Sequence, residues 1–333
     1  MKRIAVLGLC LLMWAGFSAF AGGSGEAAPA APQAGDAAVK ITVAHMFPEK
    51  DPYHLGILEA EKYLKEKTNG RITFEIYPNG TYGEQLNSVQ AVTMGTLDVF
   101  NHSFSSDYYE PAGALQGPYL FRDYGHWRKF IGSDVYKEIV AGLEKAMNSK
   151  IISSYHYGFR EVVFTDKAAS PQEFNGKNMR VVNFAPYPEA ATVLNTTGVP
   201  LGINDVYMAI KTGVVKGTEN PLQQIRVNNF HEVTKYLILT DHMLAIGTWI
   251  MSDKKYNSLS AGDKKLVEEA FWVASKTIEQ GYEAAEKECV DQFKAAGLEV
   301  ITPNKTPFME RLPLVFKKYP KWEEIYKRVQ AIK

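Results

Sequence analysis

Segments with strand spacing alternate with helical segments along this chain, and the alternation limits the folds open to it. Residues 40–44 and 72–76 have the β-branched or alternating pattern of strands. Residues 52–69 have helical spacing and end in Asn-Gly, and 84–94 form a second helical pattern before a strand through Val99. Because strands joined by helices tend to pair in parallel, we predict an α/β fold with a largely parallel sheet covered by helices.

The length of the chain indicates two lobes. Its 333 residues are too many for one ordinary core and suit two α/β lobes of roughly 100–200 residues each. A second alternating run has a strand at 179–182 and helices at 186–197 and 204–212. The spacing of Ala91-Val92-x-x-Gly95-x-Leu97 recurs in Ala209-Ile210-x-x-Gly213-x-Val215. Helix–glycine–strand units are common, so this recurrence is weak support for two related halves.

The C-terminal third contains one long helical pattern. It begins at Ser260 with a good helix start and continues at helical spacing to Gly297. A helix of this length reaches about 50 Å, which exceeds what one small lobe needs. We therefore expect it to run along both lobes, with a bend at Gly281.

The N-terminal segment has the features of an export signal. Lys2 and Arg3 precede an uncharged apolar run, and Ala19-Phe20-Ala21 then has the small-x-small pattern of a signal-peptidase site. The run is at the lower limit for crossing a bilayer, so a retained anchor helix is the alternative. Residues 22–38 are rich in Gly, Ala and Pro, as in a flexible tether. Cys10 lies inside the apolar run, where a lipid-attachment cysteine should not, so we expect a periplasmic protein without a lipid anchor.

Composition excludes several classes of protein. Apolar residues make up 46% and charged residues 22% of the chain, which is typical of a soluble globular protein. The 37 basic and 37 acidic residues cancel, so we expect no surface basic enough to bind nucleic acid non-specifically, and no nucleic-acid partner. The two cysteines cannot form a disulfide framework.

The usual signatures of enzymes are missing. No dinucleotide-binding glycine motif follows a strand, and the sequence has neither a phosphate-binding P-loop nor a G-x-S-x-G nucleophile motif. His231-Glu232 begins like a zinc-protease motif, but Lys235 stands where the second histidine is needed. The histidines show no metal-ligand spacing with one another. We therefore predict no catalytic residues, metal or cofactor, although missing motifs do not disprove catalysis.

Arg180 is the residue that points most strongly to binding. It lies between apolar neighbours in the strand 179–182, where burial of its charge is costly. The cost is tolerated if the side chain meets an anion in a cleft, because the guanidinium fork suits a carboxylate. Two alternatives stay open from the spacing alone: a structural ion pair with an acidic residue, and an arginine on an edge strand that reaches water.

A series of short motifs runs along the chain in a fixed order: Tyr77-Pro78-Asn-Gly80, Gly95-Thr-Leu97-Asp98, Gly158-Phe159-Arg160, Phe174-Asn-Gly176-Lys177-Asn-Met-Arg180-Val181, Asp205-Val-Tyr207-Met-Ala209-Ile-Lys-Thr-Gly213-Val-Val, Gly217-Thr-Glu219-Asn220-Pro221, Phe230-His-Glu232-Val-Thr-Lys235-Tyr236 and Thr240-Asp-His242. In these motifs the chain resembles, over nearly its whole length after the signal, the DctP-like periplasmic solute-binding subunits of TRAP transporters. Their order and spacing match the family throughout. Lys216 is a departure, because the family usually has Asp before this glycine.

The resemblance implies a two-lobe periplasmic-binding-protein-like fold, with hinge strands, a cleft between the lobes and a long helix along both. It also implies a salt bridge with two hydrogen bonds between Arg180 and a ligand carboxylate. Arg160 is implied as a second positive contact, and Asn220 as a polar one. Glu219 is expected to orient an arginine rather than touch the ligand, because a carboxylate would repel an anion.

Five more candidate ligand-binding residues follow from placing the sequence on that architecture. They are Asn183, Phe184, His45, Asn101 and His102. The first two come soon after Arg180, where a strand ends at the cleft, and the other three follow strands of the opposite lobe. The polar ones can hydrogen-bond a ligand hydroxyl. For each, the alternative of a loop residue without ligand contact stays open.

The expected organisation of the chain combines the patterns with the resemblance. It comprises a signal peptide (1–21), a tether (22–38), the first part of lobe 1 (39–158), lobe 2 (159–248), and a return hinge strand, spanning helix and C-terminal helices that pack on both lobes (249–333). The expected partners are a small organic acid and the membrane permease of a TRAP transporter. A sugar acid, a hydroxy or keto acid and a dicarboxylate remain open as ligands. An exported enzyme acting on a carboxylated molecule and an ABC-type binding protein remain the alternatives.

Overall fold

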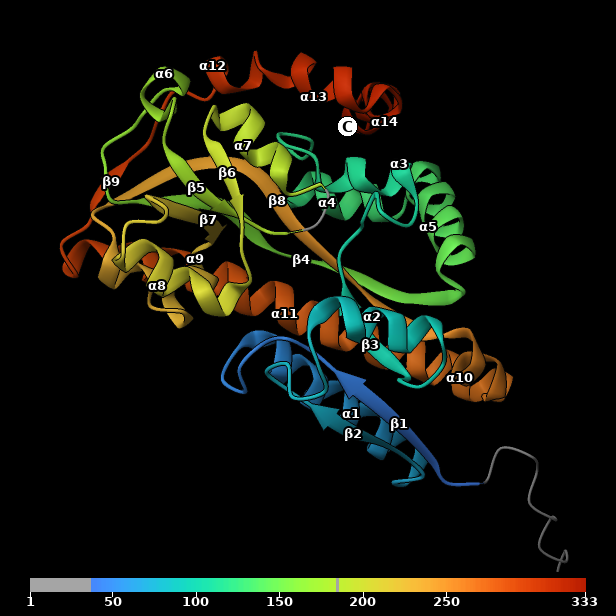
Figure 1. The fold of residues 1–333 in the computed structure, drawn as a ribbon. Coiled ribbons are helices and arrows are strands. Elements are labelled where there is room, and N and C mark those ends of the chain that lie inside the picture. The colour runs from blue at the N-terminus through green and yellow to red at the C-terminus, as the bar shows by residue number, and fades with distance from the viewer. Residues whose placement is uncertain (1–36, 184–185) are drawn as a thin grey trace, which may run out of the picture. The chain divides into compact units, whose positions relative to one another are not determined.

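The structure is a computed structural model that describes residues 37–183 and 186–333 (Figure 1). The predicted signal peptide, nearly all of the predicted tether and the candidate Phe184 lie outside the described residues. The described residues belong to one compact unit, Gly35–Lys333.

The described strands form one mixed sheet. They are β1 (Val39–Ala44), β2 (Ile72–Tyr77), β3 (Val99–His102), β4 (Ser149–Phe164), β5 (Asn178–Val181), β6 (Thr197–Pro200), β7 (Gly217–Pro221), β8 (Tyr236–Ser252) and β9 (Glu299–Ile301). Their order across the sheet is β2-β1-β3-β8-β4-β7-β5-β6, and β9 pairs with β8. We call β1–β3 with their helices the first lobe, and β5–β7 with theirs the second lobe.

Two long strands connect the lobes. β4 and β8 pair antiparallel over almost their whole length, and β8 pairs with β3 at one end while β4 pairs with β7 at the other. The outer pairs β1–β2, β1–β3, β5–β6 and β5–β7 are parallel. The expectation of a largely parallel sheet therefore holds within each lobe but is wrong at the centre, because strands that pass between the lobes in opposite directions must pair antiparallel.

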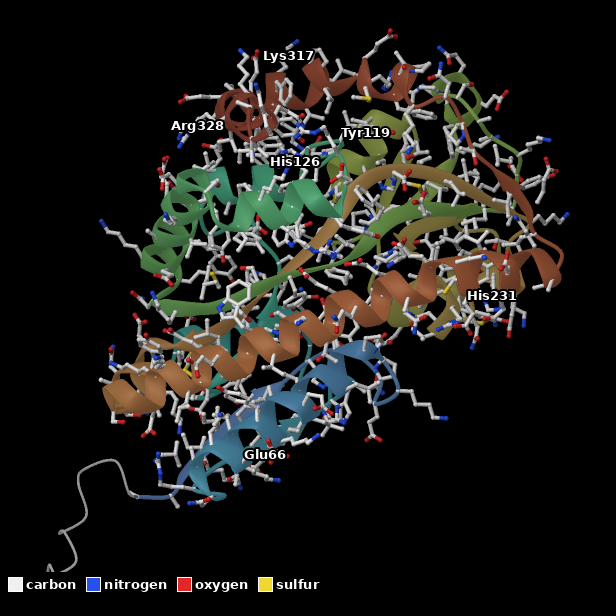
Figure 2. The ribbon with its side chains drawn as sticks, turned by 180° about the vertical axis from the view of Figure 1, so that it is seen from behind. Glu66, Tyr119, His126, His231, Lys317 and Arg328 are labelled. Atoms are coloured by element: carbon white, nitrogen blue, oxygen red, sulfur yellow. The ribbon has the colours of Figure 1, made fainter. Side chains whose placement is uncertain are left out.

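Helices cover both faces of the sheet. They are α1 (Pro52–Thr68), α2 (Gln85–Thr93), α3 (Glu110–Gly113), α4 (Tyr124–Ile131), α5 (Asp134–Met147), α6 (Pro171–Phe174), α7 (Pro188–Leu194), α8 (Val206–Lys211), α9 (Leu222–Val227), α10 (Asp253–Ser258), α11 (Ala261–Ala295), α12 (Thr306–Met309), α13 (Leu312–Lys318) and α14 (Pro320–Gln330), with short 3₁₀ turns η1 (Ala114–Gln116), η2 (Ile203–Asp205) and η3 (Phe230–Val233). On one face α11 packs against β4, with α1 beside it in the first lobe and α9 beside it in the second (Figure 2).

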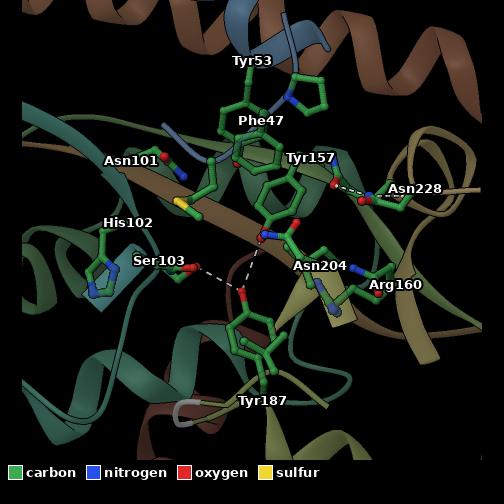
Figure 3. A pocket seen from close by; sticks show the side chains of 18 of the residues that line it. Phe47, Tyr53, Asn101, His102, Ser103, Tyr157, Arg160, Tyr187, Asn204 and Asn228 are labelled. Atoms are coloured by element: carbon green, nitrogen blue, oxygen red, sulfur yellow. Dashed lines mark hydrogen bonds between the residues drawn. The ribbon is translucent and has the colours of Figure 1, made fainter. Parts of the chain in front are cut away.

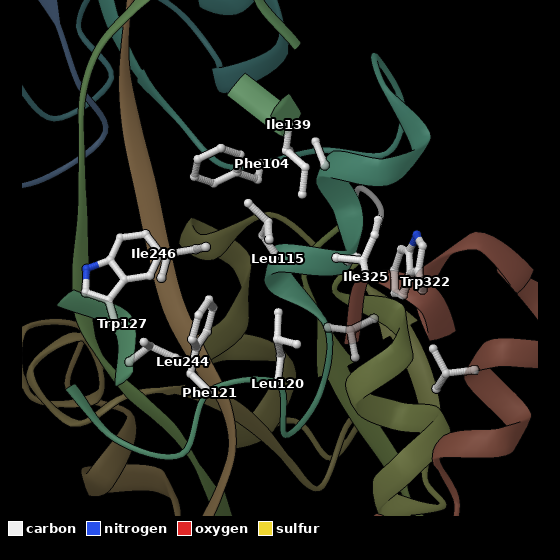
Figure 4. Packing of buried hydrophobic residues seen from close by; sticks show 14 of the residues in the cluster. Phe104, Leu115, Leu120, Phe121, Trp127, Ile139, Leu244, Ile246, Trp322 and Ile325 are labelled. Atoms are coloured by element: carbon white, nitrogen blue, oxygen red, sulfur yellow. The ribbon is translucent and has the colours of Figure 1, made fainter. Parts of the chain in front are cut away.

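The opposite face carries the largest apolar cluster. Trp127 of α4, Leu115 of η1 and Trp322 of α14 belong to this cluster together with Leu244 and Ile246 of β8 (Figure 4). All five side chains are fully or almost fully buried. The C-terminal helices thus help to close the core around the strands that join the lobes, and the two-lobe α/β fold class is confirmed.

The predicted lobe boundaries at 158/159 and 248/249 fall inside β4 and β8. Both strands continue through these positions, so the boundaries stay a prediction. Within the part of the chain that the structure describes, no helix has the length and apolar character needed to cross a membrane.

Side-chain caps define the ends of the helices that the sequence predicted most clearly. The Asp51 carboxylate accepts a hydrogen bond from Tyr53 N at 3.0 Å and begins α1, and Asn69, with φ of 50°, ends it in a left-handed conformation. Ser260 caps α11 by accepting from Asp263 N at 3.1 Å. Both helices therefore begin and end close to where the sequence predicted.

Gly281 has a different role from the predicted bend. α11 continues as α-helix through this position. A Cβ atom on Gly281 would lie only 2.8 Å from Cβ of Pro52, at the start of α1. The glycine thus permits close packing of α1 on α11, which helix periodicity alone cannot show.

We predict that Gly281→Val lowers the free energy of unfolding by about 1–3 kcal/mol, because the added atoms overlap α1. Gly262→Ala is the matched control in the exposed first turn of α11, where the new methyl group meets no close neighbour. It should raise stability by up to ~1 kcal/mol through helix propensity. Urea unfolding measures both, and wild-type stability of Gly281→Val would contradict the close packing.

Candidate functional site

A cavity of about 140 Å³ lies between the two lobes (Figure 3). Its described lining residues are Met46, Phe47, Pro48, Tyr53, Asn79, Gln85, Asn101, His102 and Ser103 from the first lobe, Tyr157, Arg160 and Gly247 from the long strands, and Arg180, Val182, Tyr187, Ile203, Asn204, Asn220, Gln224 and Asn228 from the second lobe. The cavity therefore lies where β4 and β8 pass from one lobe to the other.

Arg180 is buried in the middle of the second-lobe sheet. β5 lies between β6 and β7, with Arg180 opposite Val199 and Thr218, and only 3% of the residue is exposed. Nε of Arg180 donates to Leu201 O at 2.9 Å, whereas Nη1 is buried without a hydrogen-bond partner among the described residues. The sequence left two alternatives open for Arg180, an edge strand that reaches water and a structural ion pair. The structure supports neither, because β5 is not at an edge and no acidic residue in the described chain forms an ion pair with Arg180.

Arg160 has the counter-charge that Arg180 lacks. Nε of Arg160 donates to Glu219 Oε2, and Nη2 donates to Glu219 Oε1 at 2.9 Å and to Glu219 O at 2.8 Å. His242 Nε2 lies 3.3 Å from Glu219 Oε2, and its Nδ1 lies 2.8 Å from Thr240 Oγ1. The Glu219 carboxylate is fully buried within this group. It therefore fixes the position of Arg160 at the wall of the cavity.

Electrostatics separate the two arginines. Burial disfavours the charged forms of Arg160 and Glu219, but their mutual attraction outweighs it, so the pKa of Arg160 is raised and that of Glu219 is lowered to about 2. Burial lowers the pKa of Arg180 to about 10, a shift that the Glu219 charge only partly offsets. Arg180 is still protonated at neutral pH. Two positive charges and one negative charge therefore leave one buried positive charge beside the cavity.

Aromatic rings form two walls of the cavity. Phe47 and Tyr53 stack with centroids 3.5 Å apart on the first-lobe side. On the other side the Arg160 guanidinium lies over the Tyr187 ring at 4.9 Å. The Tyr187 hydroxyl lies 3.0 Å from Ser103 Oγ and 3.3 Å from the Tyr157 hydroxyl, which ties the walls together (Figure 3). These rings therefore place apolar surface beside the charged groups.

Uncharged polar groups supply the remaining hydrogen-bonding capacity. The amides of Asn101, Asn204, Asn220 and Asn228 line the cavity, and Asn101 Oδ1 is buried without a hydrogen-bond partner among the described residues. Burial lowers the pKa of His102 to about 4, so this imidazole is neutral at pH 7. Such groups suit ligand hydroxyls rather than further charges.

The structure brings together five of the eight candidate ligand-binding residues. Arg180, Arg160, Asn220, Asn101 and His102 all line the cavity. Their contact with a ligand stays a prediction.

His45 and Asn183 are not among the described lining residues. His45 is fully buried at the end of β1, where its Nε2 lies 3.1 Å from His54 Nδ1 and its Nδ1 accepts from Phe47 N at 3.3 Å. The residues that follow it, Met46 to Pro48, reach the cavity instead. Asn183 is exposed.

Sequence reasoning did not select several aromatic and amide residues that line the cavity, among them Tyr157, Tyr187, Asn204, Gln224 and Asn228. Tyr157 and Tyr187 lie within seven positions of Arg160 and Arg180, so a search for aromatic residues beside the arginines would find them. Gln224 and Asn228 are one turn apart in and just after α9. Their only sequence signal is this helical spacing, which is too common to identify a site.

Lys216 lies outside the cavity lining at a surface turn. Its N–H donates to Asn178 O at 2.8 Å, its carbonyl accepts from Thr165 N at 2.7 Å, and its ammonium lies 3.6 Å from Asp166. The departure from the family pattern therefore changes surface charge while the turn keeps its backbone hydrogen bonds. Within residues 37–183 and 186–333, no group of three or more His, Cys, Asp or Glu side chains is arranged to hold a metal ion.

Comparison with known proteins identifies the family. The family model described as bacterial extracellular solute-binding protein, family 7 (DctP), matches residues 43–322, so the chain belongs to this family of TRAP solute-binding proteins. The predicted resemblance is confirmed, and with it the expectation of a binding protein rather than an enzyme. The sialic acid-binding periplasmic protein SiaP of Vibrio cholerae is 28% identical over 258 residues, which cover 77% of this chain and 80% of that protein.

Solved structures show the same fold. A TRAP periplasmic solute-binding protein from Pseudomonas putida F1 with bound D-glucuronate has a TM-score of 0.83 at 23% identity, covering 89% of this chain and 98% of that one. One from Bradyrhizobium with bound D-galacturonate has a TM-score of 0.81 at 25% identity, covering 87% and 99%.

We predict that Glu219→Gln lowers the free energy of unfolding by about 3–5 kcal/mol at pH 7, because Arg160 loses its buried counter-charge. The pKa of Glu219 is depressed from 4.5 to about 2, so its ionised form stabilises the fold above pH 4.5, and this contribution falls as the pH drops towards 2. Urea unfolding between pH 3 and 7 should show this loss in wild type and not in the variant. The same pH dependence in both proteins would contradict the claim that ionised Glu219 stabilises the fold through its pairing with Arg160.

Proposed function

We propose that this protein captures a sugar acid with a single carboxylate in the cavity between its lobes. The observation that carries the proposal is the buried Arg180 guanidinium, which has a free Nη1 and no counter-charge of its own in the described chain. An anion that enters the cavity supplies that charge. Its carboxylate would accept hydrogen bonds from Arg180, with help from Arg160 and Asn220.

The charge balance favours one carboxylate over two. Arg160 is already neutralised by Glu219, and the described lining contains no other cationic side chain. The second carboxylate of a dicarboxylate would therefore be buried without a partner, which is costly. The cavity offers Asn101, Asn204 and Asn228 instead, and these amides suit hydroxyl groups. The uronates bound by the solved relatives combine one carboxylate with several hydroxyls.

Binding would work through enclosure. Charge-assisted hydrogen bonds contribute roughly 1.5–3 kcal/mol each, so the contacts of Arg180, Arg160 and Asn220 can supply much of the ~8 kcal/mol of micromolar binding. Closure of the lobes removes water and strengthens these contacts. A ligand that contacts both lobes favours the closed form in proportion to its higher affinity for it. The closed form would then deliver the ligand to a TRAP permease in the membrane.

Export to the periplasm is part of the same proposal. The family is one of extracellular and periplasmic binding proteins, and the first residues have the pattern of a cleaved signal. N-terminal sequencing of the exported protein should give Gly22 as the first residue.

We predict that Arg180→Ala weakens binding of D-glucuronate by about 2–5 kcal/mol, because the carboxylate would be enclosed without its partner. Arg180→Lys should also bind weakly, since a point charge cannot replace the fork. Arg128→Lys is the control, because Arg128 lies outside the cavity lining and pairs with Glu283. Calorimetry measures all three, and wild-type affinity of Arg180→Ala would refute the assigned role.

We predict that, in a thermal-shift panel, sugar acids with one carboxylate stabilise the protein and that neutral sugars, amides and dicarboxylates do not. D-Glucuronate, D-galacturonate and L-gulonate should raise the melting temperature, whereas glucuronamide, glucose and succinate should not. The amide and the sugar lack the charge that pairs with Arg180, and succinate carries one carboxylate too many. Stabilisation by succinate equal to that by the sugar acids would contradict the choice of a monocarboxylate.

A further inference from the structure

Asp51 is a fully buried carboxylate at the junction of the two lobes. It directly precedes α1 of the first lobe, and its Oδ2 accepts from Gln224 Nε2 at 3.0 Å. Gln224 belongs to α9 of the second lobe and also lines the ligand cavity. A hydrogen bond between the lobes therefore involves a side chain that lines the cavity.

Tyr282 of α11 completes the arrangement. Its hydroxyl lies 3.1 and 3.2 Å from the two Asp51 oxygens and 2.6 Å from Gln224 Nε2. α11 runs past both lobes, so Tyr282 supports the contact from the helix that both share. Asn228, another lining residue, donates to Gln224 O at 2.8 Å.

We propose that Asp51 is a positioning residue of the ligand site, which with Tyr282 holds Gln224 in place and couples closure of the lobes to uptake of a proton. The inference rests on the proposed binding of a sugar acid between the lobes. When α9 moves away from α1, Asp51 loses Gln224 and gains water. When the lobes close, the carboxyl group is buried again.

The direction of the coupling follows from this burial. In the described structure, where Gln224 contacts Asp51, burial raises the pKa of Asp51 from 3.8 to about 6, although Tyr53 N, Tyr282, Gln224 and the charge of Arg226 partly oppose the shift. In water the pKa returns towards its ordinary value. The closed form therefore holds the proton more tightly. The stabilisation of the closed form relative to the open form by this proton is complete below the ordinary pKa of about 4. It is lost as the pH rises through about 6.

The groups that face Asp51 do not titrate in the same range. Tyr53 on α1 and Tyr282 on α11 have pKa values raised well above 10 by burial. Tyr157 of β4, which contacts both rings, behaves likewise. Arg226 of α9 forms an ion pair with α11, in which its Nη1 lies 3.0 Å from Glu288 Oε1.

Two titrating groups nearby require controls. Glu286 lies one turn after Tyr282 and hydrogen-bonds Tyr124, and burial raises its pKa to about 7. Burial lowers the pKa of His102 in the cavity to about 4, so exposure of this imidazole on opening would oppose the effect of Asp51, and the comparison of wild type with Asp51→Asn removes this contribution. Glu286→Gln therefore separates a general effect of α11 carboxylates from an effect of Asp51.

The test is the affinity for D-glucuronate at pH 5.5 and pH 7.5, measured by calorimetry at constant ionic strength. The ratio of the affinity at pH 5.5 to that at pH 7.5 should be ~4-fold higher in wild type than in Asp51→Asn, which keeps the shape and the cap without a titrating group. Glu286→Gln should give the wild-type ratio. Equal ratios in wild type and Asp51→Asn, or a ratio in Glu286→Gln equal to that of Asp51→Asn, overturn the proposal.

A second measurement needs no ligand. Spin labels at the exposed positions Glu66 on α1 and Lys211 on α8 report the separation of the lobes by pulsed electron resonance. From pH 7.5 to 5.5 the ratio of closed to open forms should rise ~4-fold more in wild type than in Asp51→Asn. If no sugar acid binds, the proposed function fails and this measurement alone decides on Asp51. Distances with the same pH dependence in both proteins overturn the role of Asp51 even when ligand binds.

Discussion

Two buried guanidinium groups, those of Arg160 and Arg180, lie in the field of one buried carboxylate, that of Glu219. Glu219 is bound by Arg160 and receives no hydrogen bond from Arg180. A buried charge without a partner is among the most expensive features of a protein interior, and a fold retains it where something else provides the partner. Arg180 lines the cavity, and under the proposed function the carboxylate of a ligand there supplies the missing partner.

The antiparallel strands β4 and β8 place this imbalance between the lobes. Arg160 is on β4, where the strand also pairs with β7, the strand of Glu219 and Asn220. His242 on β8 reaches Glu219 from the other side. Because both strands also extend to the first lobe, the charged group is attached to the elements about which the lobes would move. Asp51 of the first lobe is hydrogen-bonded to Gln224, which lines the same cavity, so under our proposal closure of the lobes acts on two buried charged groups.

The sequence was sufficient for the fold class because its periodicities are local. Residues 52–69 and 260–297 have clear caps and helical spacing, and their helices appear close to the predicted positions. Arg180 could be selected because an arginine among apolar strand residues conflicts with its surroundings. The antiparallel centre of the sheet, the packing of Gly281 on Pro52 and the burial of His45 depend on contacts between distant segments, which spacing does not encode.

The most direct test is a crystal structure of the protein with the sugar acid that stabilises it most. A ligand carboxylate oxygen should lie within hydrogen-bonding distance of Arg180 Nη1, in the cavity between the lobes, while Arg160 remains bound to Glu219. A ligand whose carboxylate lies elsewhere, with the Arg180 guanidinium facing only protein atoms, would contradict the account.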